Sequence, residues 1–485
     1  MFNILEATIS QIQAAVAAKA LTYRELTLMY LERIAALDSC DGGLNSVLEI
    51  NPDALNIAQI MDDDRDKIAN RGPMYGIPVL IKDNINTAVN MRTSAGSLAL
   101  EDNYTSDADI IMNLKYAGAI ILGKVNMTEF ANWMSRQGMP NGYSSRGGQV
   151  LNPYNKDADV SGSSSGSAVA VAANLCVVSV GTETYGSIIA PSIANGIVGI
   201  KPTTGLLSGN GIIPISSTLD TAGPMARTVE DAAYLLDALQ SGHGNVGTNR
   251  YYMYASPYVQ NQKHDYTQGL VSARLRGLNI GVYGASGDDA AFNASLAQVL
   301  SQFESAGAAL TMDVPSVVPE SAWSYIGEHI AMNEFKACMD QYLQSSYFGG
   351  NAKCRSLKDI IEFNNEHADA CLKYGQDLLI ASFECTSGRF TEPDYIMGLS
   401  RREKARTDLL NVFSHHDLDV LIGAQEHVGI APITGFPSGT IPIGFRENGV
   451  PIGLNFIAKP HDEARLIRAM YAAEQLLGQR KPPIL

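Results

Sequence analysis

The chain has 485 residues, 46% of them hydrophobic, and its 35 basic and 50 acidic side chains give a formal net charge of −15. Neutralising nucleic-acid phosphates or an anionic membrane requires clustered Lys and Arg, which this acidic chain lacks. The apolar content also excludes a disordered chain or a fibre. We therefore expect a protein with a large core and no nucleic-acid partner.

The chain also lacks signals for export, membrane insertion or metal binding. Its first residues have no basic region before an apolar one, and the longest apolar run, 168–180, is broken by Asn174 and Ser179. We expect no signal peptide and no membrane span. Six cysteines lie far apart without a CxxC pair, so neither a disulfide scaffold nor a zinc site is predicted. These observations favour a cytoplasmic location.

The first third of the chain shows clear periodicity. Helical spacing covers 9–38, interrupted at Leu21, and Thr22 with Glu25 three residues later fits a capping box. The apolar run 77–81 predicts a buried strand that ends at Lys82. Further along, the pattern predicts a helix over 107–118 and a strand over 120–122.

The composition then changes. Residues 135–167 are rich in Gly, Ser and Asn, and an Ala/Val segment at 168–173 and a strand at 177–180 follow. The stretch 181–225 has few secondary-structure signals, yet Lys201 and Asp220 are its only charged side chains between Gly186 and Pro224. An uncharged stretch of this kind predicts packed, irregular backbone that builds a site.

The rest of the chain alternates helical and strand patterns. The predicted elements are a helix at 228–240, a strand at 278–282, a mostly helical region at 319–412, strands at 420–422, 438–443 and 452–457, and a last helix at 462–477.

Three segments point to chemistry. Lys82 follows five apolar residues, 161–167 form a Ser/Gly loop that runs directly into an apolar segment, and 181–187 form a tight turn after a strand. Each alone has an ordinary explanation: a solvated lysine, a linker or phosphate-binding turn, and any strand-to-helix turn. A P-loop does not fit, because the GxxxxGK[ST] lysine is missing.

Together the segments resemble the amidase signature family of serine hydrolases. The resemblance spans essentially the whole chain and rests on the segments 76–84, 161–167, 181–187, 196–203, 220–228 and 451–456. It implies an α/β fold: a single large domain over 1–485 with a central mixed, twisted sheet and helices on both faces. The catalytic core would cover about 65–240, and 241–485 would complete the sheet and the substrate mouth.

The resemblance also implies a Ser–Ser–Lys triad. Ser187 matches the nucleophile, Lys82 matches the general base, and Ser163, which follows a cis peptide bond in the family, matches the serine that bridges them. The backbone N–H groups of Thr184, Tyr185, Gly186 and Ser187 match the oxyanion hole. No cofactor and no metal are implied, and we expect a monomer or a homodimer.

These roles agree with simple chemistry. An amine with an ordinary pKa of ~10.4 is protonated at pH 7 and cannot act as a base, but burial disfavours the charged form. Successive N–H groups in a tight turn can stabilise a developing oxyanion. A Ser–His–Asp triad is disfavoured, because none of the eight histidines accompanies a G-x-S-x-G elbow; His427, near the expected substrate mouth, is predicted to be structural or to touch substrate.

The chain departs from the family pattern at several positions. Glu183 replaces the usual Asp, Tyr185 stands where Gly is common, and Ile189 replaces an Arg that some members use for anionic substrates. The segment 423–438 also differs and looks short. A left-handed backbone at Tyr185 would be costly, and the sequence alone does not decide which conformation the turn adopts there.

Sequence details around 181–184, 195–199 and 211–216 are most similar to peptide amidases, which remove the amide from peptide C-termini. We therefore expect an amide hydrolase that acts on a small-molecule or peptide amide. Three alternatives remain: the ammonia-producing subunit of a tRNA-dependent amidotransferase, a hydrolase of aryl, fatty or cyclic amides, and a non-catalytic scaffold.

Overall fold

The computed structural model describes the chain apart from residues 1, 66, 69–70, 89, 241–264, 284–288, 316–322, 346, 350–352 and 425–427. The strands are β1 (Val47–Ile50), β2 (Pro78–Lys82), β3 (Ile120–Val125), β4 (Tyr143–Ser144), β5 (Gly148–Gln149), β6 (Val178–Glu183), β7 (Val198–Lys201), β8 (Thr221–Ala226), β9 (Asn279–Tyr283), β10 (Ala309–Val314), β11 (Val420–Gly423), β12 (Ser438–Phe445) and β13 (Pro451–Ile457).

The α-helices are α1 (Ile9–Ala17), α2 (Tyr23–Leu37), α3 (Ala54–Asp63), α4 (Asp109–Tyr116), α5 (Ser165–Ala172), α6 (Ile189–Ala194), α7 (Val229–Gln240), α8 (Ala290–Ser305), α9 (Glu328–Gln344), α10 (Leu357–Glu366), α11 (Ala368–Cys371), α12 (Asp377–Glu384), α13 (Pro393–His415), α14 (Ile430–Thr434) and α15 (Glu463–Leu477). Short turns of other helix types lie at Leu98–Leu100, Glu129–Asn132, Leu270–Ser272 and Trp323–Gly327.

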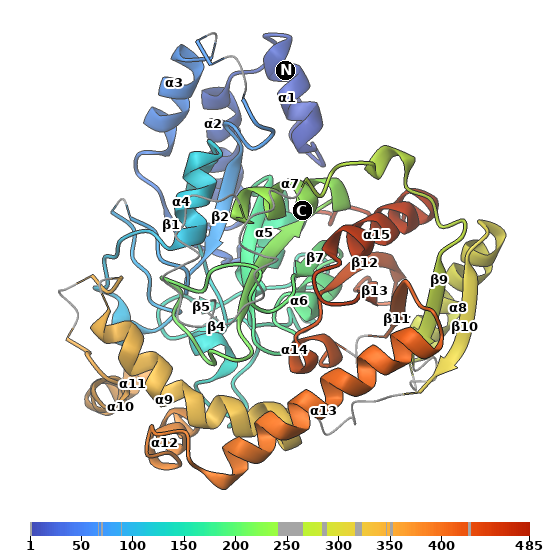
Figure 1. Cartoon of the computed structure of the whole chain (residues 1–485). Helices are drawn as coiled ribbons and strands as arrows, with labels where there is room; N and C mark the ends of the chain where they lie inside the picture. The colour runs from blue at the N-terminus through green and yellow to red at the C-terminus, as the bar shows by residue number, and fades with distance from the viewer. Residues whose placement is uncertain are drawn as a thin grey trace.

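Within the described residues, eleven strands form one mixed sheet in the order β1-β3-β2-β6-β8-β7-β12-β13-β11-β9-β10, and β4 and β5 form a separate hairpin. Strand β2 pairs in parallel with β3 and β6, whereas β6 pairs antiparallel with β8. Helices α5, α7 and α15 pack on the sheet, while α9, α12 and α13 run along one side of the molecule (Figure 1). The predicted single-domain α/β fold with a mixed sheet is confirmed.

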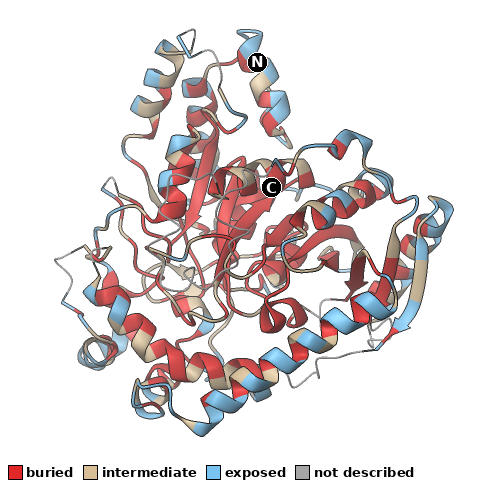
Figure 2. Cartoon of the chain, in the orientation of Figure 1, coloured by how far each residue is buried: buried red, intermediate tan, exposed pale blue. Residues whose placement is uncertain are grey.

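The strands in the middle of the sheet are buried (Figure 2). Every residue of β2, β3 and β6 is buried. Parallel strands covered on both faces are expected to be continuously apolar, as 77–81 is. Ligands of α/β proteins bind beyond the carboxyl ends of such strands. Lys82 ends β2 and Glu183 ends β6, so this edge of the sheet is where a site is expected.

Most predicted elements are present. The capping box at the start of α2 forms, with Glu25 N–H donating to Thr22 Oγ1 and the Glu25 carboxylate accepting from Thr22 N–H. The segment 319–412 contains the helices α9 to α13, as expected. No helix in the described part of the chain is long and apolar enough to span a membrane.

The stretch 181–225 is more regular than we predicted, because it contains α6, β7 and most of β8. Strand β8 has the sequence TAGPMA and is buried at every position, so it shows no alternation of polar and apolar residues. Its Pro224 pairs with Val180 of β6, whereas the residue pairs between β7 and β8 are Val198 with Ala226 and Gly199 with Met225. Proline is disfavoured inside strands, and the segment shows no alternation, so the sequence pattern did not predict this strand.

Candidate active site

Lys82 is fully buried at the end of β2. Its Nζ lies 2.9 Å from Ser163 Oγ, 2.8 Å from Ser164 Oγ, and 2.9 and 3.1 Å from the hydroxyl and carbonyl oxygens of Thr182. Burial lowers the pKa of Lys82 to about 7. Burial therefore favours the uncharged amine near neutral pH, and an uncharged amine has a lone pair that can accept a proton.

The two serines beside Lys82 are not equivalent. Ser164 Oγ donates to the carbonyl of Thr182 at 3.0 Å and accepts from Thr182 N–H at 3.2 Å. Its hydroxyl proton is thus committed to the backbone. Ser163 is completely buried and its hydroxyl contacts Lys82, so Ser163 is the one of the two serines whose hydroxyl can donate to the neutral amine. The Gly162–Ser163 peptide is cis, as the family resemblance implied.

Ser187 lies in the turn between β6 and α6. Its carbonyl accepts a hydrogen bond from Ser164 N–H at 3.3 Å, which ties this turn to the loop that carries Ser163. Ser187 is 7% exposed, whereas Ser163 and Lys82 are 0% exposed. The three residues predicted to form the triad therefore come from neighbouring segments, and Ser187 is the one that reaches the surface.

The turn is held by Glu183. Its carboxylate accepts from the N–H groups of Ile188 at 2.7 Å and Ile189 at 3.0 Å. Burial raises the pKa of this carboxyl, and the Lys201 charge and the bonded amides oppose that increase. The left-handed residue is Gly186, with φ of +82°, and Tyr185 is not left-handed. The bulky residue at 185 is thus accommodated without the backbone cost that we considered.

Asp220 is a functional candidate that the sequence interpretation did not single out. Its Oδ1 accepts from the Thr184 hydroxyl at 2.6 Å, and its Oδ2 accepts from the N–H groups of Ile215 at 2.7 Å and Ser216 at 3.0 Å. Burial raises the pKa of Asp220 to about 6, and its negative charge in turn raises the pKa of Lys82. The sequence signal that could have identified Asp220 is that it is one of only two charged residues between Gly186 and Pro224.

A cavity of about 710 Å³ opens beside this network. Asn84, Thr182, Thr184 and Asp220 lie in its wall, and residues of α9 and α13 form other parts of it. Asn84 Nδ2 donates to Thr182 Oγ1 at 3.0 Å, which connects the wall to the contacts of Lys82. Small-molecule sites usually have volumes of ~300–1,000 Å³, so this cavity can hold a ligand-sized molecule.

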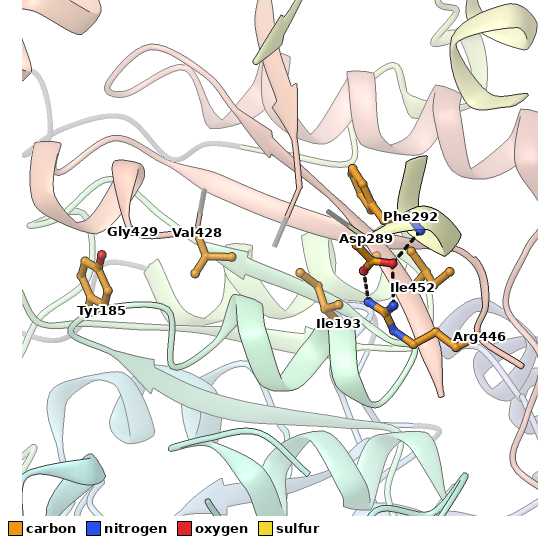
Figure 3. Close-up of a pocket in the computed structure, with 9 residues that line it drawn as sticks. Tyr185, Ile193, Asp289, Phe292, Val428, Gly429, Arg446 and Ile452 are labelled. Carbon is orange, nitrogen blue, oxygen red and sulfur yellow. Dashed lines mark hydrogen bonds and ion pairs between the residues drawn. The ribbon is translucent and has the colours of Figure 1, made fainter. Parts of the chain in front are cut away.

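A second cavity, of about 410 Å³, is lined by Tyr185 at one end (Figure 3). Val428, Ile193 and Ile452 contribute apolar walls, and an ion pair in which Arg446 Nη1 lies 2.8 Å from Asp289 Oδ1 borders it. The Tyr185 ring packs against the backbone at Gly429, where a Cβ atom would overlap the tyrosine oxygen. The predicted residue His427 lies outside the described residues.

Comparisons with known proteins identify the family of the chain. A sequence profile of the family described as Amidase matches residues 25–426. The chain belongs to the amidase family. It is 36% identical to a probable amidase of Arabidopsis thaliana, with 99% of this chain and 92% of the relative covered. The solved peptide amidase of Stenotrophomonas maltophilia superposes with a TM-score of 0.90 at 38% identity, covering 99% of this chain and 98% of that one. The amidase family and its peptide amidase neighbours make the protein an amide hydrolase.

A different activity is represented among the relatives. A glutamyl-tRNA(Gln) amidotransferase subunit from Exiguobacterium sibiricum is 31% identical over 92% of this chain and 93% of its own length. Among the described residues, no group of three or more His, Cys, Asp or Glu side chains is arranged to hold a metal ion.

Proposed function

We propose that the protein hydrolyses carboxamides through an acyl-enzyme on Ser187, with Lys82 as the base and Ser163 as the proton relay. The observation that carries this proposal is the 2.9 Å contact between Lys82 Nζ and Ser163 Oγ, made by an amine whose pKa is lowered to about 7. A buried amine of this kind can activate a hydroxyl without a histidine, as in other Ser–Lys hydrolases.

The first half of the reaction forms the acyl-enzyme. Ser187 Oγ attacks the amide carbon while its proton passes to Ser163 and the Ser163 proton passes to neutral Lys82. The carbonyl oxygen becomes an oxyanion, which the N–H groups of 184–187 stabilise. When the tetrahedral intermediate collapses, the C–N bond breaks, and the leaving nitrogen takes the proton from Lys82 through Ser163.

The second half releases the acid. Water loses a proton through the same relay to Lys82 and attacks the acyl carbon. The intermediate then collapses, Ser187 regains its proton, and the products are a carboxylic acid and ammonia or an amine. Asp220 and Glu183 act indirectly, because they hold Thr184 and the amides of the turn rather than the substrate.

The substrate class that we propose is a peptide with a C-terminal amide. The support is the 38% identity to the Stenotrophomonas peptide amidase over almost the full length of both chains. A cytoplasmic location and a monomeric or homodimeric state remain predictions of the sequence.

The direct test is ammonia release by the purified protein from a peptide amide, followed together with the mass of the peptide product. We expect one ammonia per new carboxyl terminus, and Ser187→Ala should lower kcat about 10⁴-fold or more. Retention of the wild-type rate by the Ser187→Ala variant would disprove the assignment of the nucleophile.

The alternative of an amidotransferase component is favoured by the 31% identity to the Exiguobacterium protein. Such a component would need partner chains. Turnover of peptide amides by the lone chain, at a rate above that for glutamine, excludes this alternative. A panel of aryl, fatty and cyclic amides, scored for ammonia against amine, separates the remaining classes.

A further inference from the structure

The large cavity has a second polar corner, on α13, that the proposed reaction does not use. Arg402, Glu403 and Arg406 line the cavity there. Arg402 is only 9% exposed, although arginine is rarely buried unless it is paired. Arg402 and Arg406 are four residues apart on one helix, so both side chains start from the same helix face.

Arg402 lacks an adequate partner among the described residues. Its ion pair is a 3.4 Å contact from Nη1 to Glu403, whose side chain is 66% exposed, and solvent weakens such a pair. The Nε of Arg402 is buried and has no hydrogen-bond partner in the described chain. A buried guanidinium with donors to spare is costly unless a ligand accepts from them.

The hydroxyl of Thr204, close to Arg402, also lacks a hydrogen-bond partner among the described residues. Thr204 Oγ1 is buried, and Thr204 also lines the cavity. A Cβ atom on Gly435 would lie 3.0 Å from Arg402 Nη2 and 3.7 Å from Thr204 Oγ1. The Arg402 guanidinium group and the Thr204 hydroxyl therefore both lie close to Gly435, a residue without a side chain.

We propose that this corner, formed by Arg402, Thr204 and Gly435, binds a carboxylate of the substrate. A planar guanidinium matches a carboxylate with paired hydrogen bonds, and a threonine hydroxyl can donate a further one. The preferred substrate is then a carboxamide that also carries an acidic group. This inference rests on the proposed function, because it names the substrate class of the same cavity.

The other charges of the cavity do not supply this interaction. Asp220, which also lines the cavity, already accepts from Thr184 and two backbone amides. Glu403 competes for Arg402, but a carboxylate inside the cavity is shielded from solvent and binds more strongly. Ile189 stands next to the nucleophile turn, so no arginine there duplicates the corner.

The kinetic test uses short peptide amides that differ only by Glu or its neutral isostere Gln, placed one, two or three residues from the amide. At one position the kcat/KM for Glu should exceed that for Gln by about 10- to 100-fold. Arg402→Gln should bring this ratio close to one. Lys404→Gln, which removes an exposed charge from the same helix, should leave the ratio unchanged. The absence of any Glu preference, or its survival in Arg402→Gln, overturns the proposal.

A binding test is independent of turnover. In the Ser187→Ala protein, glutarate should bind more tightly than its monomethyl ester, as measured by calorimetry, and adding Arg402→Gln should weaken glutarate binding about 10- to 100-fold. Arg402→Lys, which keeps the charge but loses the planar fork, should give an intermediate value and serves if the Gln variant does not fold. Equal glutarate affinity with and without Arg402 overturns the proposal. If glutarate binding depends on Arg402 but the wild-type protein hydrolyses no amide, the carboxylate site is supported and the proposed function is refuted.

Discussion

Two buried lysines lie on adjacent strands, and they differ in what they touch. Lys82 ends β2 and Lys124 lies on β3, where it pairs with Ile81. Both are fully buried, and burial lowers the pKa of Lys82 to about 7 and that of Lys124 to about 8. Lys124 Nζ donates to the carbonyl of Ile85 and to Thr93 Oγ1 at 2.9 Å. Lys82 also contacts a threonine hydroxyl and a carbonyl, those of Thr182, but in addition it contacts two serine hydroxyls.

The comparison shows that a lowered pKa alone does not make a catalytic base. The Thr93 hydroxyl beside Lys124 donates to the same Ile85 carbonyl. The hydrogen bonds around Lys124 therefore end at a backbone acceptor. The Ser163 hydroxyl beside Lys82 belongs to the loop that is bonded to the Ser187 turn. We infer that Lys124 stabilises the backbone after β2 and that Lys82 moves protons.

The largest expected effect separates the two lysines directly. Lys82→Met should lower kcat for amide hydrolysis about 10⁴-fold or more, because no other neutral amine contacts Ser163 among the described residues. Stopped assays of ammonia release on protein with a native circular dichroism spectrum provide the measurement. Activity within tenfold of the wild type would show that Lys82 is not the base.

The next effect separates the two serines beside Lys82. Ser163→Ala should lower kcat about 10²- to 10⁴-fold, the usual contribution of a proton-transfer group, whereas Ser164→Ala should cost less because its proton is held by Thr182. The same kinetic assay on both variants is sufficient. A larger loss in Ser164→Ala would transfer the relay to that residue.

The third effect concerns pH. Lys82 must be neutral to accept a proton, so kcat/KM should fall about tenfold per unit as pH decreases below about 7. The Asp220 charge raises the pKa of Lys82, so Asp220→Asn should lower that pKa and move the acidic limb to lower pH. Profiles of kcat/KM from pH 5 to 9 measure both. An acidic limb that moves to higher pH in Asp220→Asn contradicts this electrostatic coupling.

The smallest effect is expected at Lys124. Lys124→Met should change kcat per folded molecule less than about tenfold and should leave the acidic limb in place, because Lys124 contacts neither serine. Thermal unfolding monitors the structural cost separately. A change in the pH profile as large as that of Asp220→Asn would show that both lysines belong to one titrating network.

The sequence predicted much of this arrangement because its signals are local. Five apolar residues before Lys82 indicated a buried strand, and the Ser/Gly loop and the turn around Ser187 identified the family. The partners of Lys82 beyond Ser163 were not predicted, because Thr182 and Ser164 reach Nζ through strand pairing and loop packing that spacing does not encode. Strand β8 escaped prediction because it is buried throughout and contains Gly223 and Pro224. Asp220 was visible only as an isolated charge, and its contact with Thr184 required the fold.

The most direct test of the central claim is mass spectrometry of the enzyme trapped with a slowly hydrolysed amide or ester. We predict one acyl group per chain, on the peptide that contains Ser187, formed by the wild type above pH 7 and not by Lys82→Met. An acyl group on Ser163 or Ser164, or acylation of Ser187 at the wild-type rate in Lys82→Met, would contradict the account.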